Sequence, residues 1–323
     1  MNELIKVDSQ EKKELIEIFK TGKSEKTLKS YLTALEDFSD FMRLSSTEDA
    51  IHKFFELDGG KANLLVNDYR QVLLEKARNA PSTINRKLSA IRSVVKLGRM
   101  LGLISWQIEV KNLPATSYKD TSGPGSKTIE TLIHQLRIAG SNKAIRDIAI
   151  LRLFHDLGLR RAELSRLNFE DLIPIQAILW VQGKGKLEKE ALSLPEPTME
   201  ALLNWLKVRG QAGGALFYSL DKGSGKNQGE RSMSDYRRLS GQGIWKIITT
   251  YGKSLGIKIR PHGIRHTAIT NAVEMTEKLG LTLDQAMDFS RHKRIDTLLI
   301  YRDRIDNVQG KLANAIAKKV QEK

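Results

Sequence analysis

Cysteine is absent from this chain of 323 residues, and so is any long run of apolar residues. The first absence excludes disulfides, thiolate zinc sites and cysteine nucleophiles. The second leaves no stretch near the roughly 20 apolar residues that a membrane-spanning helix needs. The polar start, MNELIKVDSQEKKEL, also lacks the apolar core of a signal peptide. These absences predict a cytoplasmic protein with no membrane partner.

Two short motifs that would indicate a metal or a nucleotide are incomplete. His262 and His266 have the spacing of a helical zinc pair, but Gly263 stands where a metalloprotease has its glutamate. The GSGK at 223–226 matches the end of a phosphate-binding loop, yet Leu220 stands in place of the loop's first glycine. We therefore expect no metal and no other cofactor.

Positive charge is in excess. Lys and Arg number 53 against 38 Asp and Glu, which gives a formal net charge of +15. Such an excess favours a polyanionic partner, bound through phosphate contacts with release of counterions. Nucleic acid is the expected partner, and a membrane surface is the alternative. At 40% hydrophobic residues, the chain is also long enough for two domains with buried cores.

The first part of the chain is predicted to be helical. Residues 24–42 place apolar side chains at helical spacing behind Ser24, a residue type that caps helices. A second helix is predicted after Pro81, within a stretch at 76–107 that holds seven basic residues and no acidic one. A cationic helix face of this kind suits a DNA backbone, although a merely solvated charged face is the ordinary alternative. The side chains expected to contact DNA are Arg86, Lys87, Arg92, Lys96 and Arg99.

A connector at 112–127 loses hydrophobic periodicity and gathers Pro, Ser, Thr and Gly, which marks a domain boundary. We expect a helical domain at 1–111, a second domain at 128–303 and a C-terminal helical tail at 304–323. The second domain is predicted to be mainly helical, with two strands over 178–195 joined by a Gly-Lys-Gly-Lys turn. The tail carries an apolar stripe that packs either on a neighbouring protomer or on its own domain. The members of the stripe are Ile305, Val308, Leu312, Ile316 and Val320.

Basic side chains and one tyrosine follow one another along the second domain in an order that fits phosphoryl transfer. They are Arg160, Lys184, His262, Arg265, His292 and Tyr301. Guanidinium groups can donate paired hydrogen bonds to the nonbridging oxygens of a phosphodiester, over which the transition state spreads negative charge. Taken singly, most of these residues have an ordinary structural interpretation. Their order, with HxxR followed by a His and a Tyr nine residues apart, favours the functional interpretation.

This constellation resembles the active site of the tyrosine recombinases, the phage-integrase family of site-specific DNA recombinases. The likeness covers about residues 128–303 through its motifs. It extends more weakly to 24–110, which looks like the family's helical core-binding domain. The resemblance implies a mainly α fold with a small antiparallel β element, in which a core-binding domain and a catalytic domain form a clamp on DNA.

Phosphate binding is expected from three of these side chains. Arg160 and Arg265 would bind the nonbridging oxygens, because a guanidinium stays charged in proteins. His292 would donate a hydrogen bond to the phosphate. Glu163 lies one helical turn past Arg160, where the family has an acidic residue, and it would orient a basic partner.

The chemical step is expected at Tyr301, whose phenol has a reference pKa of about 10 and must lose its proton to attack phosphorus. His262 is the expected partner for that proton. Lys184, on the predicted hairpin turn, would protonate the departing 5′ oxygen. The expected product is a 3′-phosphotyrosine, which the 5′ hydroxyl of another duplex later reverses, so neither ATP nor a metal is required.

The chain departs from the family's commonest pattern in two places. Ser290 and Arg291 precede His292 where Leu-Gly is usual, and Thr297 and Leu298 stand where a paired threonine is usual. Neither departure touches a candidate catalytic side chain, but both are expected to alter the local packing around His292.

Double-stranded DNA is the partner that the resemblance implies, with a homotetramer assembled on two duplexes and accessory DNA-bending or directionality proteins as further partners. A nucleoid-associated location would follow. Two alternatives remain: a type IB topoisomerase, which would rejoin the same strand, and a noncatalytic DNA-binding protein. The biological task, whether integration or excision of a mobile element or resolution of chromosome multimers, is open at this stage.

Overall fold

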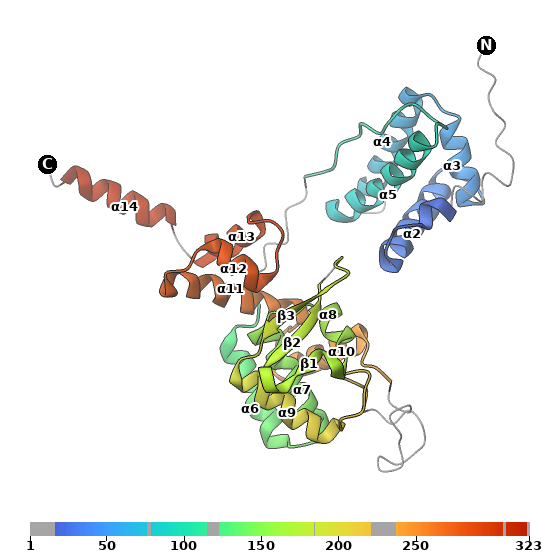
Figure 1. The fold of residues 1–323 in the computed structure, drawn as a ribbon. Coiled ribbons are helices and arrows are strands. Elements are labelled where there is room, and N and C mark those ends of the chain that lie inside the picture. The colour runs from blue at the N-terminus through green and yellow to red at the C-terminus, as the bar shows by residue number, and fades with distance from the viewer. Residues whose placement is uncertain are drawn as a thin grey trace. The chain divides into compact units, whose positions relative to one another are not determined.

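The computed structural model describes residues 17–75, 79–114, 123–183, 185–220, 237–305 and 308–321. The chain divides into two compact units, Met1–Ser117 and Tyr118–Lys323 (Figure 1). The division falls within the connector at 112–127, whose residues 115–122 lie outside the described ranges.

The first unit contains α2 (Glu25–Phe41), α3 (Thr47–Phe55), α4 (Gly59–Glu75) and α5 (Pro81–Met100). The hydroxyls of Ser24 and Ser46 cap α2 and α3 by accepting a hydrogen bond from the backbone N–H three residues later. Phe38 meets Phe54 and Tyr69 edge to face, with ring centroids 5.3 and 5.1 Å apart. Both helices predicted in this part of the sequence are confirmed.

The second unit is built mainly from helices. Before the sheet and around it lie α6 (Ser126–Ala139), α7 (Asn142–Asp156), α8 (Arg161–Arg166), α9 (Glu196–Arg209) and α10 (Gly241–Ser254). The later helices are α11 (Pro261–Leu279), α12 (Leu283–Ser290), α13 (Asp296–Ile305) and α14 (Val308–Gln321). Ile150 and Phe154 of α7 are fully buried, and α6, α9 and α11 all contact this central helix. The core of the unit therefore forms around α7.

A small antiparallel sheet lies beside these helices, with strand order β1-β2-β3. Its strands are β1 (Leu172–Ile173), β2 (Ile178–Gln182) and β3 (Lys189–Ser193), and Trp180 pairs with Ala191 in the β2–β3 register. The predicted pair of strands and the mainly helical fold with a small β element are confirmed. Strand β1 was not predicted, because two residues are too few to show an alternating pattern.

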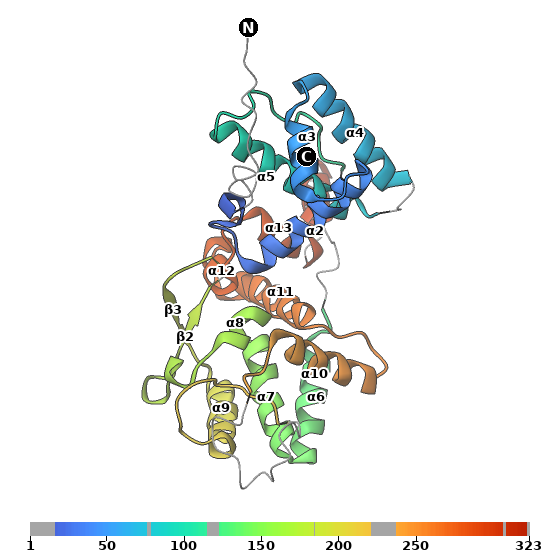
Figure 2. The ribbon, with the colours of Figure 1, turned by 90° about the vertical axis from the view of Figure 1, so that its right-hand side faces the viewer.

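A separate group of helices carries the last part of the predicted catalytic motif. Helix α11 contacts both α12 and α13, and the three helices lie together in Figures 1 and 2. Their apolar side chains form a small core of their own, in which Ile269, Val273, Leu298 and Tyr301 are buried. Leu298, one of the departures from the family pattern, thus packs in the same core as the predicted nucleophile.

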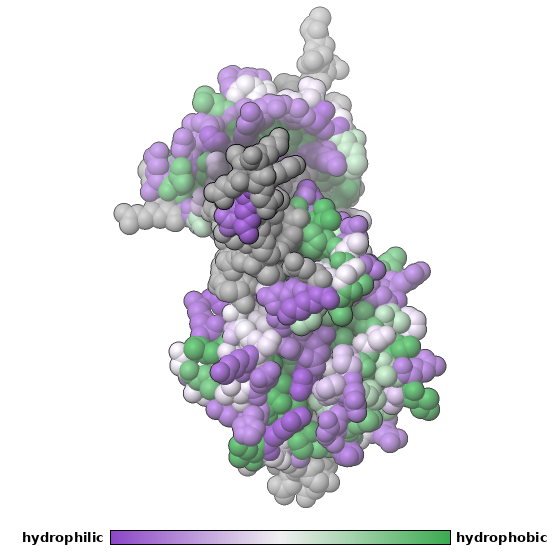
Figure 3. Space-filling model, turned by 90° about the vertical axis from the view of Figure 1, so that its left-hand side faces the viewer, coloured by the Kyte–Doolittle hydropathy of each residue, from purple (hydrophilic) through white to green (hydrophobic). Residues whose placement is uncertain are grey.

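No helix in the described ranges is both long and apolar enough to span a membrane. On the face of the second unit shown in Figure 3, hydrophobic side chains are interspersed with hydrophilic ones.

In the tail, residues 313–318 are exposed, and Ile316 is 66% exposed. The other side chains of the predicted apolar stripe lie outside the described residues, so the packing of the stripe stays a prediction.

Candidate active site

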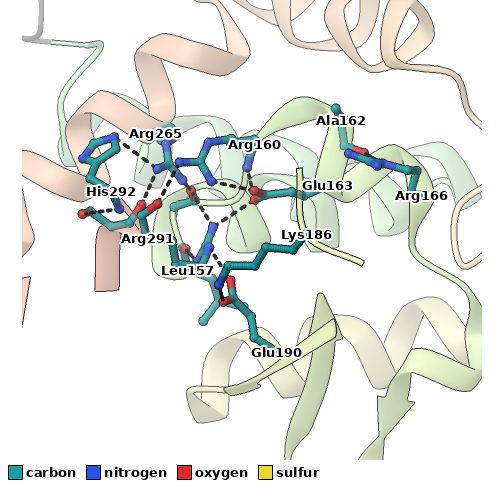
Figure 4. A network of polar contacts seen from close by, with 12 residues as sticks. Leu157, Arg160, Ala162, Glu163, Arg166, Lys186, Glu190, Arg265, Arg291 and His292 are labelled. Atoms are coloured by element: carbon teal, nitrogen blue, oxygen red, sulfur yellow. Dashed lines mark hydrogen bonds and ion pairs between the residues drawn. The ribbon is translucent and has the colours of Figure 1, made fainter. Parts of the chain in front are cut away.

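A buried carboxylate organises the start of α8. Arg160 caps this helix, and Glu163 is only 1% exposed. One oxygen of Glu163 accepts a hydrogen bond from the Arg160 backbone N–H at 2.8 Å, and the other accepts from Arg160 Nη1 at 2.7 Å (Figure 4). Glu163 therefore holds both the backbone and the guanidinium of Arg160 in place, and its part in a reaction stays a prediction.

The second predicted phosphate-binding arginine, Arg265, comes from α11 and is 2% exposed. Its guanidinium donates to the carbonyl oxygens of Gly158 and Ser290, and its Nη2 lies 3.5 Å from His292 Nε2. Arg160 Nη2 donates to the neighbouring carbonyl of Arg291 at 3.0 Å. Carbonyl groups at the end of α12 thus bring the two guanidinium groups and His292 together.

Tyr301 contacts a histidine that the sequence left without a role. The Nδ1 atom of His266 lies 2.5 Å from the Tyr301 hydroxyl, and both residues are buried. The ring of His262 packs on His266 with centroids 4.2 Å apart, and the ring of His292 lies 6.4 Å from that of Tyr301. His266 therefore contacts the phenol directly, whereas His262 contacts His266.

Burial and, after it, the local charges shift the pKa values of these groups. Burial raises the pKa of Tyr301 to about 12, although Arg265 acts in the opposite direction. Burial and the nearby arginines, Arg265 first, lower the pKa of His292 to about 4, and the same causes lower that of His262. Burial, Arg160 and Arg291 lower the pKa of Arg265 to about 9. At neutral pH the phenol is thus protonated, both imidazoles are neutral and the guanidinium keeps its charge.

A cleft of about 590 Å³ opens beside this cluster. Arg160 and His292 line it together with Gly183 and Lys186 from the turn between β2 and β3. Lys184 lies outside the described residues, so its predicted role is carried by its place in the sequence alone. The other predicted catalytic residues and Glu163 come together within this one unit.

Two residues of the cluster, His266 and Arg291, had no role assigned to them from the sequence. His266 follows His262 by one helical turn, so the same-face spacing of α11 was a usable signal. Arg291 pairs with Glu163 at 3.0 Å, and its side chain is 6% exposed. No pattern in the local sequence indicated that Arg291 would be buried, because its partner Glu163 lies 128 positions away.

The basic residues predicted to contact DNA fall into two groups in the first unit. Lys87 pairs with Asp37 at 2.7 Å, and Arg92 donates to the Val110 carbonyl and to Asn112. Both side chains are therefore tied to their own unit. Those of Arg86, Lys96 and Arg99 are exposed, and Arg99 donates to Gln107 at 2.9 Å.

Comparison with known proteins matches residues 126–307 to the phage integrase family. A tyrosine recombinase of Synechocystis is 35% identical over 311 residues, which cover 94% of each chain. Another, from Synechococcus elongatus, is 34% identical over 245 residues, covering 74% of this chain and 72% of the relative.

Two solved structures share the fold at low sequence identity. A lambda integrase dimer bound to a core site has a TM-score of 0.62 and 14% identity, and the match covers 90% of this chain and 93% of that one. A XerH site-specific recombinase bound to a palindromic difH substrate also has a TM-score of 0.62 and 14% identity, with coverage of 95% and 85%.

The depressed histidine pKa values predict how stability depends on pH. Between a reference pKa of about 6.5 and the folded value of His292, about 4, the unfolded chain binds more protons than the folded one. Stability contributed by neutral His292 is therefore present above pH 6.5 and lost as the pH falls through this window. The quantity to measure is the melting temperature of the second unit, by calorimetry on the full chain as the pH falls from about 6.5 to about 4. We expect it to decline less steeply for His292→Gln than for the natural chain. The exposed His134→Gln serves as control, and equal slopes for all three proteins would contradict the assignment.

Proposed function

The chain belongs to the phage integrase family of tyrosine recombinases, and we propose that its clustered arginines, histidines and Tyr301 perform that family's reaction. It is an enzyme of site-specific DNA recombination, which cleaves DNA strands and rejoins them through a phosphotyrosine intermediate. The topoisomerase and noncatalytic alternatives are not favoured. The observation that carries the residue assignment is the 2.5 Å contact between Tyr301 and His266, next to Arg265 and His292 of the same chain.

In this proposal Arg160 and Arg265 hold the scissile phosphate. Both guanidinium groups are fixed in place by carbonyl or carboxylate partners before any substrate arrives. Preorganised donors of this kind stabilise the charge that develops on the nonbridging oxygens without a cost of reorganisation during the reaction. His292, which is neutral in the free protein, donates a hydrogen bond to the same phosphate. Its proximity to Arg265 supports this role.

The phenol proton is proposed to pass to His266. In the tautomer that carries its proton on Nε2, His266 accepts the Tyr301 hydrogen bond at Nδ1. As the bond from the Tyr301 oxygen to phosphorus forms, His266 takes the proton and the bond from phosphorus to the 5′ oxygen breaks. Lys184 supplies the proton that the 5′ oxygen needs to leave as a hydroxyl. His262, which the sequence favoured for the phenol proton, then supports His266 through ring contact.

The nucleophile is proposed to act in cis, that is, on a phosphate held by its own chain. Tyr301 is buried in the core formed by α11, α12 and α13, and those helices also carry Arg265 and lead into His292. Attack on a phosphate bound by another protomer would require Tyr301 to leave this core.

Double-stranded DNA is the proposed substrate, and the lambda integrase and XerH structures that share the fold are bound to DNA sites. The proposed domains are a DNA-binding unit at 1–111, a linker at 112–127, a catalytic unit at 128–303 and a tail at 304–323. Exchange between two duplexes requires four cleavages, so we propose a homotetramer. The exposed Ile316 of the tail supports docking on a neighbouring protomer. Accessory DNA-bending proteins and association with the nucleoid belong to the same proposal.

Tyr301→Phe tests the nucleophile. The change removes one oxygen, so DNA binding should persist while the denaturant-resistant protein–DNA adduct on a nicked duplex disappears. Tyr31→Phe, in the first unit, is the matched control and should keep the adduct. An adduct that the Tyr301→Phe variant forms at the natural rate would assign the nucleophile elsewhere. Joint products between two duplexes, scored in the same reactions, separate recombination from rejoining of one strand.

His266→Gln tests the route of the phenol proton. Loss of a general base slows cleavage by on the order of 10²-fold. The defect should shrink as the pH rises, because hydroxide then deprotonates the phenol directly. His262→Gln is the comparison, and its defect should be smaller and independent of pH. Single-turnover cleavage rates from pH 6 to 10 measure both, and a pH-dependent defect in His262→Gln alone would restore the role to His262.

Salt dependence tests the proposed DNA-contacting surface of α5. Neutralising the exposed Arg86 and Lys96 with glutamine should lower the slope of log affinity against log salt by about 0.9 per lost phosphate contact. Lys87→Gln and Arg92→Gln should change the slope less and the melting temperature more, because both side chains bind within the unit. Lys53→Gln on α3 is the control for loss of an exposed charge. An unchanged slope in the Arg86 and Lys96 variant would identify those residues as a solvated face.

A further inference from the structure

We infer that Arg291 is a positioning residue for the step in which the 5′ oxygen leaves, because it ties strand β3 to the arginine cluster. The inference rests on the proposed function, in which a group on the β2–β3 hairpin protonates that oxygen. Four observations carry it: the backbone conformation of Arg291, the burial of its side chain, its pairing with Glu163, and its pairing with Glu190.

The backbone of Arg291 adopts a conformation that favours glycine. It ends α12 with φ 52° and ψ 39°, and its N–H donates to the Met287 carbonyl at 2.7 Å. A side chain makes this left-handed conformation less favourable, which is why glycine is the usual residue at such helix ends. Glycine would therefore make the turn at lower cost, and contacts of the Arg291 side chain must offset the difference.

The Arg291 side chain makes such contacts. Only 6% of it is exposed, and Nη1 donates to the Leu157 carbonyl at 3.1 Å. Nη2 donates to Glu163 at 3.0 Å and lies 3.3 Å from the Gly158 carbonyl oxygen. The guanidinium thus shares the buried Glu163 carboxylate with Arg160, one arginine on each side. On this side Arg291 supports the phosphate-binding pocket.

On its other side Arg291 reaches the hairpin. Its Nε lies 3.3 Å from Glu190 of β3, as an ion pair, and the dashed lines in Figure 4 run from the guanidinium to both carboxylates. Glu190 also binds Lys186 of the turn. A continuous chain of charges therefore runs from Arg160 through Glu163, Arg291 and Glu190 to Lys186.

This series of charged residues ends at the turn between β2 and β3, which carries the proposed acid for the leaving group. Glu190 pairs with Val181 next to the last pair of the ladder, Gln182 with Lys189. The turn beyond that pair holds Lys184 in the sequence, and its neighbours Gly183 and Lys186 line the same cleft as Arg160. An anchor at Glu190 thus sets how the base of the turn meets the cleft. A role limited to holding the fold would affect every step of the reaction alike.

The test compares cleavage of two nicked duplexes that differ in one atom. One has an ordinary scissile phosphate, and the other has sulfur in place of the bridging 5′ oxygen, so its leaving group needs no protonation. Arg291→Gly suits the left-handed backbone, and Glu190→Gln keeps the pairing of Arg291 with Glu163. We expect each variant to slow cleavage of the oxygen substrate by on the order of 10²-fold, as a misplacement of about 1 Å does. Glu190→Gln should cleave the sulfur substrate at close to the natural rate. Arg291→Gly, which also loses the contact with Glu163, should lose less rate on the sulfur substrate than on the oxygen substrate.

Glu163→Gln is the matched contrast, because it weakens the other arm of the Arg291 network and the support of Arg160. It should slow cleavage of both substrates. Arg291→Lys should recover part of the oxygen rate, since it restores a charge toward Glu190. Equal losses on both substrates for Arg291→Gly and Glu190→Gln would overturn the inference. Lys184→Ala, assayed in parallel, tests the proposed acid separately: failure of sulfur to rescue it would remove Lys184 from that role, whatever the other variants do.

Discussion

The buried carboxylate of Glu163 is the interaction on which the rest of the site depends. Arg160, Arg265 and Arg291 converge there, and burial, followed by repulsion from Arg160 and Arg291, lowers the pKa of Arg265. Burial alone would raise the pKa of Glu163, but Arg291 and the hydrogen bonds from Arg160 hold it below its ordinary value. Glu163 therefore stays charged, and a single negative charge allows two of the three guanidinium groups to lie side by side.

The remaining positive potential prepares the pocket for an anion. His292 and His262 are held neutral by burial and by the same arginines, so the free site does not add further like charge. A phosphate that enters would attract each of these groups and offset the repulsion between them. In the proposed reaction, this positive potential would stabilise both the bound phosphate and the transition state that forms from it.

Burial of Tyr301, the proposed nucleophile, disfavours the ionised phenolate that would attack phosphorus. Tyr301 lies in the small core of α11, α12 and α13, and its pKa is raised to about 12. A phenol in that state is a poor nucleophile until a base takes its proton, and His266 is within 2.5 Å. The same helices that protect Tyr301 in the free protein therefore present it with a partner for its proton.

Much of the chemistry could be predicted from the sequence, because it depends on residue types at short spacings. The HxxR motif, the nine-residue interval from His292 to Tyr301, and the apolar periodicity of α2 are all local patterns, and local patterns are what a sequence displays directly. The excess of positive charge was equally plain.

Only the tertiary structure decided which of these groups touch. It brought His266 rather than His262 to the phenol, tied Lys87 and Arg92 to their own unit, and buried Arg291 between Glu163 and Glu190. Arg160 meets the Arg291 carbonyl across 131 positions of sequence. Contacts of that range depend on how whole helices pack, and no pattern within a few residues encodes that packing.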